Sequence, residues 1–176
     1  MTTMCQRLLA RAAELGPLSQ ADLVAALPVC IPAAKALGLS GTAGLACLAG
    51  LVQVVAGSLS RQDEAAAACH AWLAALGTAD VATALAVHDV DLSAALAGAR
   101  SAGNDILIAA SEAVRRGLAG DIPQAETIFA DAAAAATAQA LAGNLPLYRS
   151  IRDAAMAYAQ LADPLVGLRR VLRVGQ

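Results

Sequence analysis

The stretch from Ala36 to Ser60 reads ALGLSGTAGLACLAGLVQVVAGSLS and contains no charged residue. Its length alone would permit a membrane span, which needs roughly 20 apolar residues. Five glycines interrupt it, however, and Ser40, Thr42 and Gln53 are polar. Alanine contributes little to membrane insertion, which leucine, isoleucine, valine and phenylalanine drive. We therefore predict no membrane span, and expect residues 42–57 to form a buried helix that is apolar all round because other helices surround it.

The composition favours helices throughout the chain. Of the 176 residues, 59% are hydrophobic, with alanine the commonest, and only 2% are aromatic. Alanine has the highest helix propensity because its side chain has no rotamer freedom to lose, and no stretch shows the period-two alternation of a strand. The sequence predicts a single domain over residues 1–176 with an all-α fold: an irregular multi-helix bundle of antiparallel helical hairpins around the buried apolar helix.

Glycines, prolines and capping residues divide the chain into short helical segments. Pro28 ends the second segment, because an interior proline lacks a hydrogen-bond donor, and Pro32 lies at the first turn of the next. The expected segments are 3–15, 19–27, 33–38, 42–57, 61–76, 79–87, 92–99, 105–119, 121–142, 146–162 and 165–173.

Charge is unevenly distributed along the chain, although the net charge is only −2. Residues 61–147 carry four arginines and ten acidic residues, whereas residues 148–176 carry five arginines and two acidic residues. We expect the acidic middle and the basic end to attract each other within one fold, in preference to orienting neighbouring subunits. The negative net charge and the scarcity of aromatic side chains argue against nucleic-acid binding.

Several residues of the basic end are candidates for binding a ligand or a partner. Arg149 and Arg152 are three residues apart and share a helical face, as do Arg169 and Arg173, four residues apart. Two large aromatic residues, Trp72 and Tyr148, are candidates for lining a ligand pocket.

The four cysteines predict a reducing compartment. Cys5, Cys30, Cys47 and Cys69 form no C-x-x-C pair and stand among apolar residues, as expected for buried thiols that act as small hydrophobic groups. The N-terminal residues predict an amphipathic helix and not a signal peptide, because arginines interrupt the apolar run. We therefore expect a cytoplasmic protein.

The run DVATALAVHDVDL, from Asp80 to Leu92, resembles the helix that carries the His-Asp pair in HD-domain metal phosphohydrolases. The resemblance implies a divalent-metal site made of His70, His88, Asp89 and one later aspartate, which is Asp105, Asp121 or Asp131. The sequence departs from that family in two ways. Only 18 residues separate the histidines, and Val90-Asp91-Leu92 replaces the apolar-Gly-Lys continuation.

Three functional interpretations follow. The first is a helical protein-interaction or adaptor module, including self-association, which uses an alanine- and leucine-rich face together with the arginines and requires no cofactor. The second is a metal-dependent hydrolase of the HD-domain type that uses His70, His88 and Asp89. The third is a helical bundle that binds a small molecule.

Overall fold

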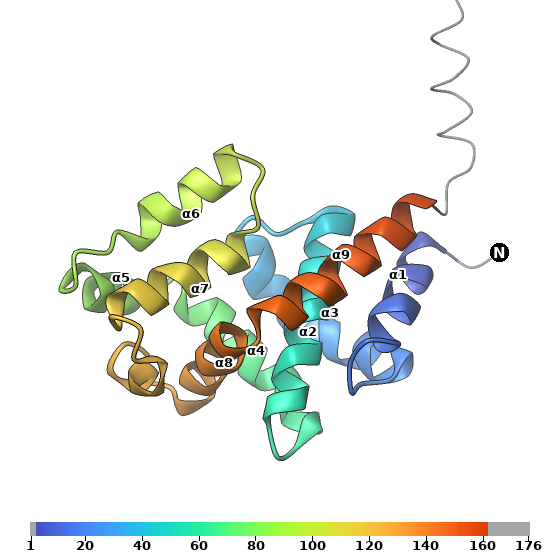
Figure 1. The fold of residues 1–176 in the computed structure, drawn as a ribbon, viewed down its shortest axis with the longest axis horizontal. Helices are drawn as coiled ribbons and strands as arrows, with labels where there is room; N and C mark the ends of the chain where they lie inside the picture. The colour runs from blue at the N-terminus through green and yellow to red at the C-terminus, as the bar shows by residue number, and fades with distance from the viewer. Residues whose placement is uncertain (1–2, 162–176) are drawn as a thin grey trace, which may run out of the picture.

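The chain is all-helical over residues 3–161, the part that the computed structural model describes, and this range contains no strand (Figure 1). The α-helices of the described range are α1 (Met4–Ala13), α2 (Gln20–Ala36), α3 (Gly41–Ser58), α4 (Ala65–Ala75), α5 (Ala79–Ala86), α6 (Leu92–Ser101), α7 (Ile106–Gly117), α8 (Ala132–Gly143) and α9 (Leu145–Leu161). Two 3-10 helices, η1 (Gln62–Glu64) and η2 (Ile122–Thr127), precede α4 and α8. The expected segment 165–173 lies outside the described residues.

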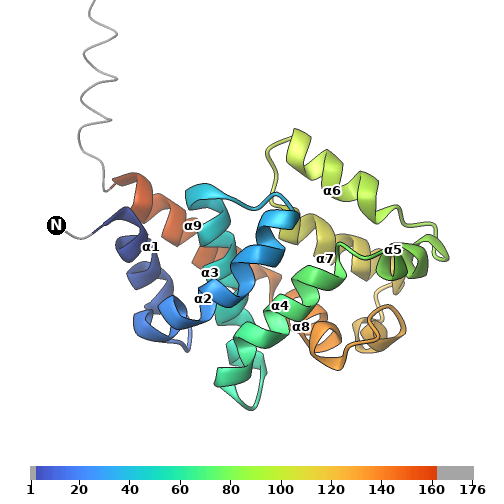
Figure 2. The same ribbon diagram turned by 180° about the vertical axis from the view of Figure 1, so that it is seen from behind.

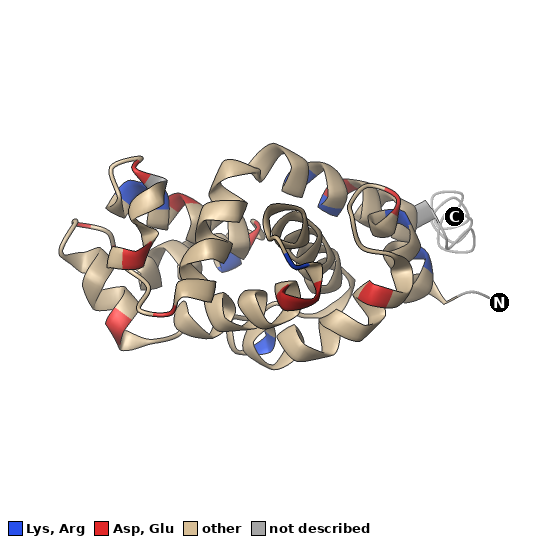
Figure 3. Ribbon diagram, turned by 90° about the horizontal axis from the view of Figure 1, so that it is seen from below, with Lys and Arg blue, Asp and Glu red and all other residues tan. Residues whose placement is uncertain are grey.

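Helix α3 forms the centre of the bundle, as the sequence predicted. By length and composition it would be able to cross a membrane, but 67% of it is buried inside the fold. It packs against α1, α2, α4, α8 and α9, and it carries no charged residue, whereas charges are spread over the outer helices (Figure 3). The predicted fold class, an all-α bundle around a buried apolar helix, is confirmed.

A close approach between α3 and α9 depends on Gly50. A Cβ atom added at this glycine would lie 3.2 Å from the ring of Tyr148 and 3.4 Å from its carbonyl oxygen. The Gly50 position therefore allows the fully buried Tyr148 to pack directly against the backbone of α3.

Gln53 is the polar exception in the middle of α3, and it is fully buried. Its side-chain oxygen accepts a hydrogen bond from the Leu18 amide (2.8 Å), and its Nε2 donates to the carbonyls of Leu18 (2.9 Å) and Ala12 (3.1 Å). A Cβ atom at Gly16 would lie only 2.4 Å from the Gln53 amide carbon. From inside the core, Gln53 thus provides hydrogen-bond partners for backbone amide and carbonyl groups at the α1–α2 connection.

Helix α2 corrects one expectation. The sequence predicted a helix that ends before Pro28 and a second one over 33–38, but α2 is continuous from Gln20 to Ala36 (Figure 2). Val24, Pro28 and Pro32 recur every four residues and are all exposed. The carbonyls of Val24 and Pro28, which lose their helical donors to the prolines, therefore lie on the solvent side, where water can bind them.

The region before α8 corrects a second expectation. The sequence predicted one helix over 121–142, but the chain forms η2, breaks, and starts α8 at Ala132. The side chain of Asp131 accepts hydrogen bonds from the amides of Ala133 (2.8 Å) and Ala134 (2.9 Å). A strong N-cap inside an alanine-rich run therefore starts a new helix. Similarly, the expected helix over 61–76 begins with η1, and α4 proper starts at Ala65.

Helix α6 lies at the edge of the bundle. It packs mainly against α7 and to a lesser extent α5, and it stands apart from the central helices at the upper left of Figure 1. Asp91 caps its N-terminus by accepting a hydrogen bond from the Ala94 amide (2.8 Å). Its position beyond α7 opens a concave surface towards α3 and α9.

Candidate functional site

A half-open groove of about 1000 Å³ lies where the start of α3, helices α6 and α7, and the second half of α9 meet. We call it the α7–α9 groove. Its lining combines small apolar side chains with charged ones: Gly38, Leu39, Ser40, Ala43, Gly44, Cys47, Ala95, Ala99, Arg100, Gly103, Asn104, Asp105, Ile106, Ile108, Ala109, Glu112, Arg116, Arg152 and Met156.

Small residues create the space. Ala43, Gly44 and Cys47 of α3, Ala95 and Ala99 of α6 and Ala109 of α7 all line the groove. Because these side chains are short, they leave the volume between the helices unfilled. The lining residues of α7, Ile108, Ala109, Glu112 and Arg116, recur at helical spacing and form one continuous face.

Asp105 closes one end of the groove with a buried polar cluster. Its Oδ1 atom caps α7 by accepting hydrogen bonds from the amides of Leu107 (2.8 Å) and Ile108 (3.3 Å). Its Oδ2 atom accepts from the Tyr148 hydroxyl (2.7 Å), the Arg152 guanidinium and the Cys47 thiol (3.6 Å). The side chain is only 6% exposed, so this carboxylate is buried with its hydrogen-bonding capacity filled.

The electrostatics of this cluster keep the thiol and the phenol neutral. Burial, reinforced by the negative charge of Asp105, raises the pKa of Cys47 to about 12. Burial, together with Cys47 and Asp105, also raises the pKa of Tyr148. Burial opposes the charge of Arg152, but its hydrogen bonds to Asp105 and Asp153 outweigh that effect and raise its pKa. Cys47 and Tyr148 therefore act as hydrogen-bond donors, and neither is a nucleophile at neutral pH.

Two ion pairs connect α7 and α9 across the groove. Arg152 pairs with Asp105, and Arg149 lies 3.6 Å from Glu112. Both acidic partners belong to the acidic middle of the sequence, so these pairs agree with the predicted intramolecular attraction. The Arg149 and Glu112 side chains are each 49% exposed, and solvent screens that pair strongly.

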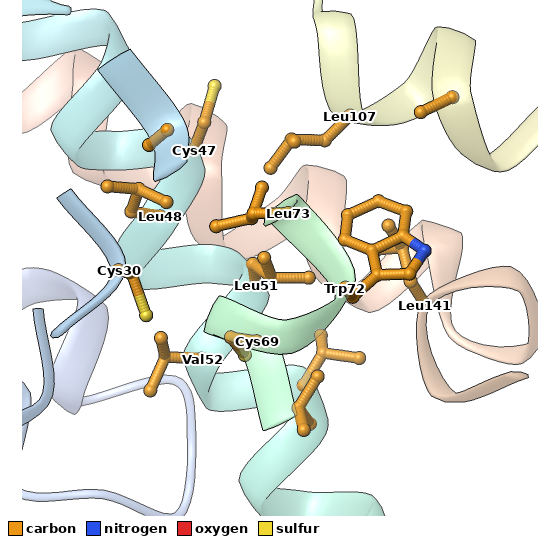
Figure 4. Close-up of a cluster of buried hydrophobic side chains, with 14 of the residues drawn as sticks. Cys30, Cys47, Leu48, Leu51, Val52, Cys69, Trp72, Leu73, Leu107 and Leu141 are labelled. Atoms are coloured by element: carbon orange, nitrogen blue, oxygen red, sulfur yellow. The ribbon is translucent and has the colours of Figure 1, made fainter. Parts of the chain in front are cut away.

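Of the predicted ligand-binding residues within 3–161, the structure brings one into the groove. Arg152 lines it, whereas Arg149 contacts Glu112 at its edge. Trp72 is fully buried in the core beside Leu73, Leu107 and Leu141, and it does not line the groove (Figure 4). Tyr148 does not line the groove, but it contacts three residues that do: it donates a hydrogen bond to Asp105, and it interacts with Cys47 and with Arg152. Arg169 and Arg173 lie outside the described residues.

The residues of the predicted metal site do not come together. In the described range, no three His, Cys, Asp or Glu side chains form a group suited to a metal ion. His88 and Asp89 lie in an exposed turn after α5, where Asp89 has a left-handed φ of 58°. His70 is half-buried on α4. The geometry gives the HD-domain interpretation no support.

Sequence reasoning missed two arginines of the groove, Arg100 and Arg116. Both stand in the acidic middle of the chain, where the excess of acidic residues gives no indication of a basic site. Arg116 lies four residues after Glu112, a spacing that places both on one face, and this was the available signal. The sequence contained no such signal for Arg100, because its place in the groove depends on how α6 packs against α7.

Comparison with known proteins adds no further information about this site. No protein-family model matches the chain, and the searches of curated proteins and of solved structures found no significant match.

Proposed function

We propose that the protein is a small-molecule-binding helical bundle and that its ligand occupies the α7–α9 groove. The observation that carries this proposal is the groove itself. Its volume of about 1000 Å³ is at the upper end of the range of ligand pockets, roughly 300–1000 Å³. Its lining combines apolar side chains with five charged ones, and polar groups that fix the orientation of a ligand are a feature of such pockets.

The walls formed by α3, α7 and α9 favour binding because hydrogen bonds hold them together. The Asp105 cluster ties the start of α7 to α3 and α9 through buried hydrogen bonds. A pocket with fixed walls loses little conformational entropy when a ligand enters, which leaves more of the contact energy for affinity.

Titration with N-phenyl-1-naphthylamine, a neutral apolar fluorophore, tests the proposal. We expect saturable binding by the unmodified protein. Ala95 is half-buried and lines the groove, whereas its neighbour Ala94 is exposed and does not. Ala95→Phe should therefore weaken binding by occupying part of the groove, and Ala94→Phe should leave it unchanged. Absence of binding to the unmodified protein, or equal binding by the two variants, would overturn the proposal.

A second candidate, the helical interaction module, is favoured by the outer face of α2. Val24 and Val29 are 52% and 46% exposed, and Pro28 and Pro32 are exposed beside them. An apolar face of this kind is a feature of association surfaces. We expect concentration-dependent self-association in sedimentation velocity, weakened by Val29→Asp. Val87→Asp is the matched control, since Val87 is 77% exposed and lies in a different part of the fold. A monomer at every concentration would contradict this candidate.

A further inference from the structure

The charges around the α7–α9 groove are only partly paired. Arg152 is neutralised by Asp105 and Asp153, and Glu112 is paired with Arg149. Arg100 and Arg116 line the groove without an ion-pair partner among residues 3–161. The lining residues carry three arginines and two acidic side chains, so the groove has a small excess of positive charge.

Arg100 is held in place by the fold. Its Nε donates a hydrogen bond to the Leu37 carbonyl (3.1 Å), at the end of α2. Its side chain packs over Gly38, where a Cβ atom would lie 3.3 Å from the Nε and where φ is +86°. The guanidinium therefore has one fixed N–H, and its two terminal amino groups are free to form a two-point interaction with a carboxylate.

We propose that the ligand is an organic carboxylate with an apolar body, whose charged group pairs with Arg100. This inference rests on the proposed function of the groove and names its ligand class. The single excess positive charge suits a monoanion, and Asp105 and Glu112 disfavour a ligand of higher negative charge. Ala43, Ala95 and Ala99 provide apolar surface for the rest of the molecule. Arg116 lies near the opposite end of α7 and adds a weaker, longer-range attraction.

Competition against N-phenyl-1-naphthylamine tests this ligand class with three probes of equal chain length. Decanoate, decan-1-ol and decyltrimethylammonium differ mainly in the charge of the head group. We expect decanoate to displace the fluorophore at a concentration at least tenfold lower than either of the others. This preference should shrink as salt is added, because the groove is open to solvent.

Arginine variants locate the carboxylate. Both arginines are exposed. We expect Arg100→Gln to weaken decanoate binding about tenfold, because it removes a charge-assisted hydrogen-bonding interaction. We expect Arg116→Gln to weaken it about threefold, because it removes only a longer-range attraction. Arg115→Gln is the matched control, since Arg115 is exposed on the same helix but does not line the groove. Unchanged affinity of each variant for the neutral fluorophore shows that the groove is intact.

The outcomes separate the two proposals. If decan-1-ol competes as well as decanoate, or if Arg100→Gln retains full affinity for decanoate, the carboxylate inference is wrong and the groove still stands as a binding site. If the fluorophore does not bind the unmodified protein, both proposals fail together.

Discussion

Asp105 connects three helices through a single carboxylate. It caps α7 and accepts hydrogen bonds from Cys47 of α3 and from Tyr148 and Arg152 of α9. Its capping role is predictable from sequence, because an aspartate before an apolar helical run is a common N-cap. Its contacts with α9 cannot be predicted from the sequence, because its partners there are 43 and 47 residues away.

Replacement of Asp105 should destabilise the protein strongly. Asp105→Ala leaves Arg152 and the Tyr148 hydroxyl without their buried acceptor, so we expect the free energy of unfolding to fall by about 3–5 kcal/mol. Asp153→Ala is the control. It removes the other acidic partner of Arg152, but that side chain is 64% exposed, and the loss should stay below about 1 kcal/mol. Urea denaturation measures both, and equal losses would contradict the importance of the buried cluster.

Cys47 should be unreactive in the native state. Its pKa of about 12 means that almost no thiolate forms at pH 8, whereas Cys5 is exposed. We expect Ellman's reagent to label Cys5 but not Cys47 at pH 8 in the folded protein, and all four cysteines in urea. Fast labelling of Cys47 in the folded protein would be incompatible with this burial.

The same pKa shift has a consequence for stability. The unfolded thiol ionises near its ordinary value of 9.0, whereas the folded thiol stays protonated up to about 12. The unfolded state therefore binds fewer protons between these values, and the free energy of unfolding should fall as the pH rises from 9 towards 12. Cys47→Ala should reduce this slope, which urea denaturation at a series of pH values measures.

At the scale of elements, α2 and α3 show where sequence rules succeed and where packing overrides them. Helix α3 was predictable almost to the residue, because an uncharged run of this length has few alternatives to burial. The prolines of α2 suggested a break, but its inner residues Leu23, Leu27 and Cys30 are buried in the core. Packing of that face compensates for the missing hydrogen bonds, which solvent partly replaces on the other side.

Replacing Pro28 tests this explanation. Pro28→Ala restores a backbone donor to the middle of α2 and removes a steric conflict, while the side chain stays on the exposed face. We expect an increase of about 1–3 kcal/mol in the free energy of unfolding, measured by urea denaturation. A decrease would show that the proline is required for the shape of the helix.

Gln53 links two elements, because its side chain satisfies the backbone that joins α1 to α2. Gln53→Leu leaves the Leu18 amide and two carbonyls buried without partners, and should lower the free energy of unfolding by about 3 kcal/mol. Gln139→Leu is the matched control, since Gln139 is hydrogen-bonded to the Pro123 carbonyl at an exposed site. Equal effects of the two variants on the urea midpoint would contradict this role.

At the scale of the whole molecule, the sequence predicted the bundle and its centre but not the groove. Around α3, small residues allow close helix packing, as at Gly50. The groove exists because α6 packs mainly on α7 and not on the central helices, and no local pattern specifies that arrangement. The closest indication of the groove in the sequence was the predicted attraction between the acidic middle and the basic end. The ion pairs Arg152–Asp105 and Arg149–Glu112 bridge the groove.

The most direct test of the central claim is a backbone amide NMR titration of the full chain with decanoate. We expect chemical-shift changes confined to the α7–α9 groove: residues 38–47, 95–109 and 112–116, and the part of α9 around Arg152 and Met156. Saturable changes centred instead on the outer face of α2, around Val24 and Val29, or the absence of saturable changes in the groove, would contradict it.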